Sequence, residues 1–126
     1  MSLVLDAGAF IAFERGDPLM AARIRVALER DDVLRTVTPV VSQVWRDPRG
    51  RQARLARLIA GVDNVSPSVE QAKAAGVLCG RTGTTDVVDS LLAGVVRNGD
   101  VVMTSDPADL SRLLATLRVR AIVSPV

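Results

Sequence analysis

The sequence predicts an α/β fold, in which a mostly parallel sheet is covered by helices on both faces. Two observations predict it. Short segments that are apolar throughout alternate along the chain with longer segments whose apolar residues recur at helical spacing. In addition, the 126 residues are 48% hydrophobic but only 2% aromatic, so the core must consist of aliphatic side chains. This length corresponds to one domain, which we expect to span residues 1–126.

The expected strands are short and rich in Val, Leu and Ile. Strands that are apolar on both faces are typical of parallel sheets buried between two layers of helices. The expected strands are residues 2–5, 33–37, 62–65, 101–104 and 119–123.

Capping signals and helical periodicity predict the helices. Asp17-Pro18 combines an N-cap aspartate with a proline in the first turn, and Thr38-Pro39 repeats this signal. Gly61 and Asn98-Gly99 are typical of positions where helices end. The expected helices are residues 7–15, 18–30, 38–46 (stopping near Asp47-Pro48), 51–60, 66–78, 86–97 and 107–117.

Composition excludes several classes of chemistry. The chain has no histidine, which excludes Ser-His-Asp and Cys-His catalysis and imidazole metal sites. Cys79 is the single cysteine, so neither an intramolecular disulfide nor a cysteine zinc site can form. With no Tyr, one Trp and two Phe, an aromatic platform for stacking bases is also excluded. Any acid–base or metal chemistry must therefore use carboxylates.

The start of the chain, MSLVLDAG, does not resemble a signal peptide, and no run approaches the roughly 20 apolar residues that span a membrane. We therefore expect a cytoplasmic protein without membrane association. The net charge is +2, and Lys73 is the only lysine among 16 basic residues. Arginine suits phosphate recognition because its guanidinium presents a fork of donors. Codon usage in a GC-rich genome explains the same bias equally well.

Two of the expected strands are followed by aspartates. Asp6 comes directly after residues 2–5, and Asp106 comes shortly after residues 101–104. In a parallel α/β sheet the ligand site lies at the carboxyl ends of the strands, near a switch in strand order. Each aspartate also has a purely structural explanation as a helix N-cap. We nevertheless expect both to face one crevice.

A second acidic pair stands at the start of a helix, in TTDVVDSLLAG. Asp86 and Asp89 are three residues apart and therefore lie on one face of that helix. Asp86 can be explained as a helix cap, whereas Asp89 begins an apolar stripe and needs a partner there. Three or four carboxylates brought together would be neutralised by Mg²⁺ or Mn²⁺. Such ions serve phosphodiester hydrolysis, because they hold substrate oxygens and activate water.

Two stretches, LVLDAGAFIAFERGD and TTDVVDSLLAGVVRNGDVVMTSDPADL, resemble the PIN domain, and in particular VapC-type toxins of VapBC toxin–antitoxin pairs. The resemblance extends over nearly the whole chain. It implies a three-layer α/β/α PIN-like fold and Mg²⁺- or Mn²⁺-dependent endoribonuclease activity. It also implies an RNA substrate, a cognate antitoxin and a homodimer.

The resemblance assigns roles to individual residues. It implies that the metal ligands and catalytic residues are Asp6, Asp86, Asp89 and Asp106. Thr104 or Ser105 would supply the hydroxyl that precedes the last of them. Asp109 is expected to be a surface residue of the last helix. The RNA backbone would meet arginines near the mouth of the site, at Arg15, Arg46, Arg49 and Arg51.

The chain departs from the family at one position. Where the family commonly has an acidic residue, this chain has Gln43, which offers only a neutral carbonyl oxygen. Asp86 or Glu14 could supply the missing charge. The alternative is a catalytically degenerate PIN-like module that binds RNA or protein. A phosphoaspartate receiver is disfavoured, because the only lysine, Lys73, lies in the middle of a predicted helix.

Overall fold

A computed structural model describes residues 1–47 and 49–126. Its centre is a five-stranded sheet with the strand order β3-β2-β1-β4-β5, and every neighbouring pair of strands is parallel. The strands are β1 (Ser2–Leu5), β2 (Val33–Val37), β3 (Asp63–Val65), β4 (Val101–Thr104) and β5 (Ile122–Pro125). The expected α/β fold with a parallel sheet is confirmed.

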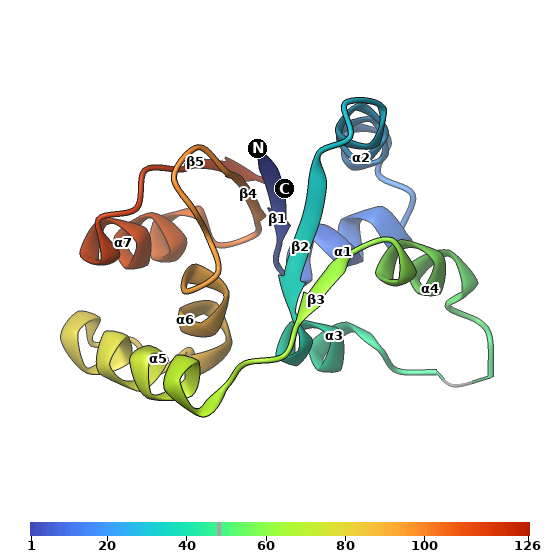
Figure 1. Cartoon of the computed structure of the whole chain (residues 1–126). Helices are drawn as coiled ribbons and strands as arrows, with labels where there is room; N and C mark the ends of the chain where they lie inside the picture. The colour runs from blue at the N-terminus through green and yellow to red at the C-terminus, as the bar shows by residue number, and fades with distance from the viewer. Residues whose placement is uncertain (48) are drawn as a thin grey trace.

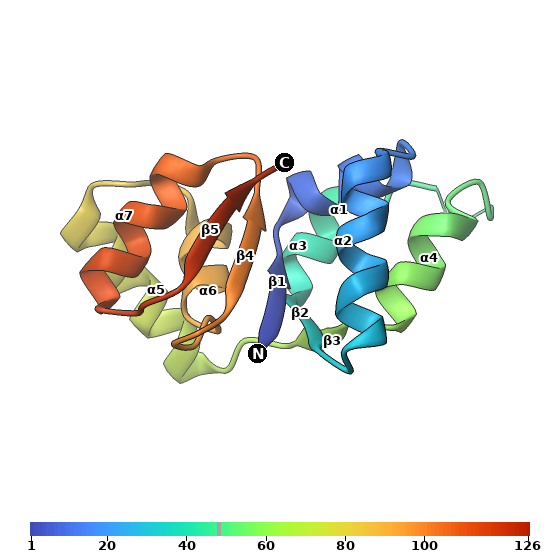
Figure 2. The ribbon, with the colours of Figure 1, turned by 90° about the horizontal axis from the view of Figure 1, so that it is seen from above.

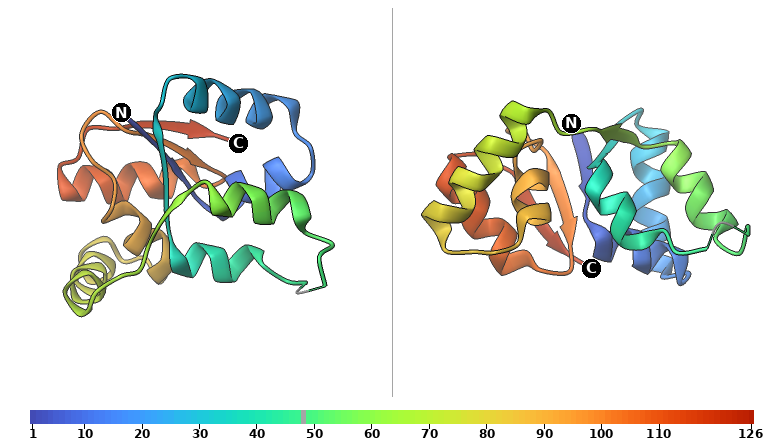
Figure 3. Two further views of the ribbon diagram at one scale, coloured as in Figure 1. Left: turned by 45° about the vertical axis from the view of Figure 1, so that its right-hand side comes forward. Right: turned by 90° about the horizontal axis from the view of Figure 1, so that it is seen from below.

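Helices cover both faces of the sheet and produce three layers (Figure 1). The two further orientations show the same division (Figures 2 and 3). One layer contains α1 (Ala7–Glu14), α2 (Pro18–Glu29), α3 (Thr38–Val44) and α4 (Ala53–Ala60). The other contains α5 (Val69–Thr82), α6 (Val87–Ala93) and α7 (Pro107–Leu117). No helix in the described part of the chain is long and apolar enough to cross a membrane.

The core is aliphatic, as the composition predicts. Val4 and Leu5 of β1 and Val102 of β4 have no exposed surface, and Phe10 and Leu55 pack into the same cluster. Because strands in the middle of a parallel sheet are buried on both faces, their sequences are continuous apolar runs. The runs end where the strands end, and polar residues follow at the carboxyl edge.

Several element boundaries differ from the prediction. Helix α6 ends at Ala93 with Gly94 as its C-cap, because the next amides make tight turns: Val95 N–H bonds the Leu92 carbonyl and Val96 N–H that of Ala93. Arg97, the expected end of that helix, lies in the following loop. The proposed stop of the third helix near Asp47-Pro48 involves Pro48, which lies outside the described residues; α3 ends earlier, at Val44.

Helix α5 and strand β5 also differ from the prediction. Helix α5 begins at Val69, after a capping box formed by Ser68 and Gln71, and it continues to Thr82. It ends at Gly83, whose φ of 75° is left-handed and suits glycine. Strand β5 covers residues 122–125 rather than 119–123, because Arg118 turns the chain in a left-handed conformation and Val101 pairs with Ile122.

A buried aspartate at the start of β4 links this strand to β1 and β2. Asp100 precedes β4 and is 3% exposed. One of its carboxylate oxygens accepts from Ser2 N–H at 3.0 Å, and the other accepts from Arg97 N–H at 2.8 Å and from Arg35 Nη1 at 3.4 Å. Arg35 is itself buried in β2, and its Nε lies 3.7 Å from Asp63 Oδ2 of β3.

The strand order places a crossover point beside β1. From β1 the chain moves outward through β2 to β3, and it then returns to the opposite side of β1 as β4. Leu5 of β1 pairs with Met103 of β4, so the two strands end side by side. Ligand sites of open α/β sheets lie at such a crossover, outside the carboxyl ends of the strands.

Candidate functional site

Asp6 joins the carboxyl ends of β1 and β4. Its side chain is buried, with 5% of the residue exposed. Oδ1 accepts a hydrogen bond from Ala9 N–H at 3.0 Å, which caps α1. Oδ2 accepts from the Thr104 hydroxyl and from Ser105 N–H at 3.1 Å. Three donors therefore fix the orientation of this carboxylate between the two strands.

Thr104 connects Asp6 to the next acidic residue. It is fully buried at the end of β4. While its hydroxyl donates to Asp6, its Oγ1 accepts from Asp106 N–H at 2.9 Å. Ser105 is exposed and takes part through its backbone amide. Of the two hydroxyls considered from the sequence, the Thr104 hydroxyl is thus the one that bonds an aspartate.

A close contact with Ser105 explains why position 8, in the segment Asp-Ala-Gly, is a glycine. A Cβ atom at Gly8 would lie 2.5 Å from both Cβ and Oγ of Ser105. The absence of a side chain therefore lets the end of β4 lie directly against the first turn of α1. This close approach is what brings the Ser105 amide to Asp6.

The acidic pair at the start of α6 lies beside these strand ends. Asp86 caps the helix through a bond from Asp89 N–H to its Oδ1 at 3.0 Å. The pKa of Asp89 is raised to about 7 from an ordinary value of 3.8. Burial is the largest cause, followed by repulsion from Asp86 and Asp6, a hydrogen bond with Asp86, and repulsion from Asp106. The fold therefore brings together the four carboxylates singled out in the sequence.

Asp109 also belongs to this group, although the sequence predicted a surface residue of the last helix. Asp106 caps α7 and accepts from Asp109 N–H at 3.4 Å. Carboxylate oxygens of Asp89, Asp106 and Asp109 all lie within 4.8 Å of one another. Asp106 and Asp109 have the same three-residue spacing at a helix start as Asp86 and Asp89, and this repeated pattern was the signal that could have found Asp109.

We call Asp6, Asp86, Asp89, Asp106 and Asp109 the carboxylate cluster. Mg²⁺ binds oxygen ligands at about 2.1 Å, so two of its ligands lie at most about 4.2 Å apart. The oxygens of Asp89, Asp106 and Asp109, within 4.8 Å of one another, are close to that spacing. Burial, and after it repulsion from Asp86 and Asp6, raises the pKa of Asp89, so the ionised form of this carboxylate lacks a compensating cation. Both observations fit a divalent cation with a preference for oxygen, such as Mg²⁺ or Mn²⁺.

Gln43 and Glu14 make no hydrogen bond to the cluster within the described residues. Gln43 is exposed on α3. Glu14, the residue that could have replaced its charge, accepts instead from Gln52 Nε2 at 2.8 Å. The same Gln52 amide donates to the Val44 carbonyl at 3.0 Å. Asp86 and Asp109, rather than Glu14, supply the additional negative charge.

The arginine nearest the cluster is also one that the sequence did not single out. Arg112 Nη2 lies 2.8 Å from Asp109 Oδ1, one turn further along α7. Two of the arginines expected at the mouth have other partners. Arg46 donates to backbone carbonyls of Ser42 and Trp45, each at 2.9 Å. Arg51 lies 3.4 Å from Asp47.

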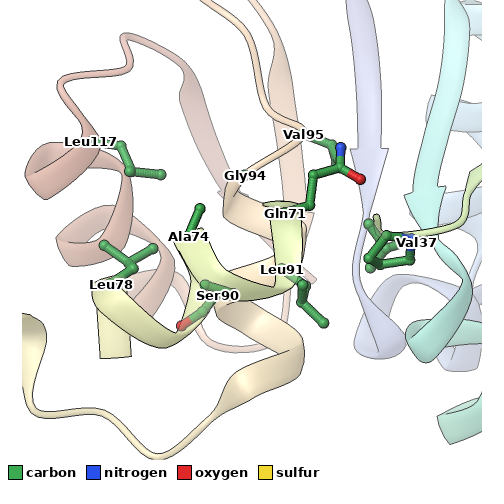
Figure 4. Close-up of a pocket in the computed structure, with 11 residues that line it drawn as sticks. Val37, Gln71, Ala74, Leu78, Ser90, Leu91, Gly94, Val95 and Leu117 are labelled. Carbon is green, nitrogen blue, oxygen red and sulfur yellow. The ribbon is translucent and has the colours of Figure 1, made fainter. Parts of the chain in front are cut away.

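A separate pocket of about 70 Å³ lies between α5, α6 and α7 (Figure 4). Its lining is mostly apolar, with Leu78, Leu91 and Leu117 around it and Ser90 and Gln71 as polar members. The Ser90 hydroxyl lies 3.2 Å from the Cys79 thiol. None of the lining residues is charged, so this pocket is not suited to a phosphodiester.

Comparisons with known proteins relate the chain to others through its fold. No model of a known protein family matches the sequence, and no curated protein matches it. The structure is similar to one chain in the crystal structure of VapBC2 from Rickettsia felis. In that crystal structure VapBC2 is bound to a DNA fragment from its own promoter. The TM-score is 0.69 at 10% sequence identity, and the similarity covers 100% of this chain and 99% of the other. The expected PIN-like three-layer fold is thereby confirmed.

Proposed function

We propose that this chain is a single PIN-like domain with Mg²⁺- or Mn²⁺-dependent endoribonuclease activity, the toxin of a toxin–antitoxin pair. The observation that carries the proposal is the carboxylate cluster, which lies at the crossover point of a fold similar to a VapBC2 chain. Acidic residues at this edge of the sheet combine the position of a ligand site with the chemistry of a metal site.

Each member of the cluster has a proposed role. Asp89, Asp106 and Asp109 would hold the metal ion, since their oxygens lie closest together. Asp6 holds the two strand ends in place and has one lone pair of its carboxylate beyond its three donors, which is available to a ligand. Asp86 orients Asp89 and adds negative charge beside it.

A divalent ion in this cluster supplies a Lewis acid that neutralises charge on a phosphodiester and helps to ionise water. The protein residues fix the geometry around it. Thr104 holds Asp6 with its hydroxyl and the Asp106 backbone with its oxygen, so both sides of the site move as one unit. The exposed Ser105 and Asp106 leave the cluster open to a long substrate such as RNA.

The proposal includes partners and location. The similar structure is that of VapBC2, and the sequence resemblance points to VapC-type toxins. We therefore propose an antitoxin partner, a homodimer and a cytoplasmic location.

The second candidate function is a degenerate PIN-like module that binds RNA or protein without cleaving it. Gln43 favours it, because the residue is neutral and its exposed side chain makes no hydrogen bond to a cluster carboxylate within the described residues. The presence of five clustered carboxylates favours the enzyme.

Cleavage of RNA by the purified protein separates the two functions. The substrates are a mixed-sequence single-stranded RNA and bulk cellular RNA, each incubated with Mn²⁺, with Mg²⁺ and with EDTA. If the protein is the proposed enzyme, it cleaves the RNA, and either EDTA or the substitution Asp89→Asn abolishes cleavage. The control Asp31→Asn leaves cleavage intact, because Asp31 is an exposed aspartate outside the cluster. RNA bound but not cleaved under all three conditions would establish the binding module instead.

A further inference from the structure

Arg112 stands out among the charged residues around the cluster. Of the ion pairs in the described chain, the pair between Arg112 and Asp109 is the one that involves a cluster carboxylate. Its Nη2–Oδ1 distance is 2.8 Å, the shortest of these ion pairs. The side chain of Arg112 is 53% exposed, whereas that of Asp109 is 28% exposed. The guanidinium thus lies at the solvent side of the cluster.

An anionic substrate cannot approach five carboxylates without compensating cations. A divalent ion neutralises two of the charges, and the rest still repel a phosphodiester. Arginine is well suited to offset this repulsion, because its planar fork bonds two phosphate oxygens at once. A guanidinium held at the rim by a carboxylate of the cluster is positioned for that contact.

We propose that Arg112 is a substrate-contact residue, whose guanidinium Asp109 holds at the rim of the carboxylate cluster to bind a phosphate of the RNA next to the scissile one. The proposal rests on the proposed ribonuclease function and adds a residue to it. Asp109 then serves two groups, since one carboxylate faces both the other metal-binding oxygens and Arg112. Arg112 orients towards RNA, while Asp89 and Asp106 face the metal.

This arrangement predicts effects of opposite sign on two ligands. A guanidinium beside a divalent cation repels it, so removal of Arg112 strengthens metal binding, by about three- to tenfold at low salt. The same change removes a phosphate contact, so it weakens RNA binding by about tenfold. Simple damage to α7 would weaken both.

The test measures both ligands on the same variants. Mn²⁺ binding to Arg112→Ala, Arg112→Lys and Arg120→Ala is measured by calorimetry without RNA. Arg120 is the matched control, because it is exposed and lies before β5, at the opposite end of the strands. Binding of a mixed-sequence single-stranded RNA of about 20 nucleotides is measured at several salt concentrations. These measurements use the Asp89→Asn background, in which the RNA is expected to stay intact.

We expect Arg112→Ala to bind Mn²⁺ more tightly and RNA more weakly, and to reduce the log–log salt slope by about 0.7. Arg112→Lys should keep the slope and lose part of the RNA affinity, because it keeps the charge without the fork. Arg120→Ala should match the parent protein. Unchanged RNA binding in Arg112→Ala overturns the proposal, as does weaker binding of both ligands.

Cleavage by the wild-type protein is recorded separately. RNA binding that depends on Arg112 without any cleavage would support the contact and refute the proposed enzyme. Cleavage that is insensitive to Arg112→Ala at low RNA concentration would leave the enzyme standing and refute the contact.

Discussion

At the scale of single residues, Asp89 is the group most affected by its surroundings. It is half-buried, and three other aspartates act on it. Burial and repulsion both disfavour its ionised form, which is why its pKa rises to about 7. Bound metal would reverse this balance, because the ionised form would then be the one that is stabilised.

The raised pKa predicts how stability changes with pH in the metal-free protein. Between about pH 4 and pH 7 the folded chain keeps a proton on Asp89 that the unfolded chain has lost. The stabilisation from this group is therefore complete below the unfolded pKa and disappears as the pH rises through 7. In EDTA, the melting temperature of the wild type should fall from pH 5 to pH 8 more steeply than that of Asp89→Asn. Parallel curves for the two proteins would contradict this prediction.

Asp109 gives a second prediction at this scale. Replacement by Asn removes a charge and weakens a metal-binding oxygen without changing the shape of the side chain. Affinity for Mn²⁺ in calorimetry should fall by at least about tenfold, the low end of losses seen when residues that support a metal site are removed. Asp31→Asn is the control, because Asp31 is exposed and Asn tolerates its positive φ of 56°. Equal affinities in the two variants would remove Asp109 from the metal site.

At the scale of elements, the site depends on the contact between the first turn of α1 and the end of β4. Gly8 and Ser105 meet there without room for another carbon. Thr104, Ser105 and Asp6 are then held together by hydrogen bonds. A displacement of one element moves carboxylates contributed by both.

Gly8→Ala tests this contact. The new Cβ would lie 2.5 Å from Ser105 side-chain atoms, so the end of β4 must shift. We expect unfolding in urea to show a loss of about 1–3 kcal/mol, typical of overpacking, together with weaker Mn²⁺ binding. Gly80→Ala is the matched control: Gly80 lies inside α5 with open space around its Cβ position, so alanine should stabilise by about 0.5–1 kcal/mol. Equal stability of the two variants would mean that the Gly8 contact is not tight.

The sequence predicts these elements well where a capping residue and an apolar run agree. Asp6, Asp17, Asp86 and Asp106 are N-caps in the structure, and each precedes the helix that it was expected to cap. The end of α6 was misplaced, because Gly94 and Asn98-Gly99 are both plausible stops and local sequence does not rank them. In the structure the chain leaves the helix at Gly94: the amides of Val95 and Val96 bond carbonyls three residues back, and Arg97 N–H bonds the Asp100 side chain in the loop that follows.

The residues of the site, like the helix ends, could be predicted where the local sequence determines them and not where packing between distant elements does. Strand ends and helix starts predict that carboxylates gather at one edge, and four of the five were found in this way. The surroundings of Gln43 depend on how helices pack, which no spacing along the chain specifies, whereas Asp109 repeats the three-residue spacing of Asp86 and Asp89 and could have been found from it. Packing likewise determines the surroundings of Arg112, whose sequence context is an ordinary exposed helix face.

At the scale of the whole molecule, aspartates hold both ends of the pair formed by β1 and β4. Asp6 joins the carboxyl ends, and Asp100 joins the amino ends through Ser2. Asp100 also compensates the buried charge of Arg35 in β2. The central strands are thus fixed in register by buried polar groups, in addition to their apolar contacts.

Asp100→Ala tests the amino-end connection. It leaves the guanidinium of Arg35, which is 7% exposed, without its buried partner, and it removes acceptors from two backbone amides. Loss of one member of a buried pair costs about 3–5 kcal/mol, which chemical denaturation would detect. Asp63→Ala is the control, because Asp63 is 57% exposed and lies 3.7 Å from the same arginine; its loss should cost about 1 kcal/mol or less. Similar losses for both variants would show that burial does not matter here.

The hydrogen bonds between Asp6 and the end of β4 join residues 98 and 99 positions apart. During synthesis a ribosome therefore produces β1, β2, β3 and their helices long before Thr104, Asp106 and Asp109 exist. Until β4 and α7 have emerged, the nascent chain contains only Asp6, Asp86 and Asp89 of the cluster. The proposed ribonuclease therefore has no complete carboxylate cluster until β4 and α7 have been synthesised.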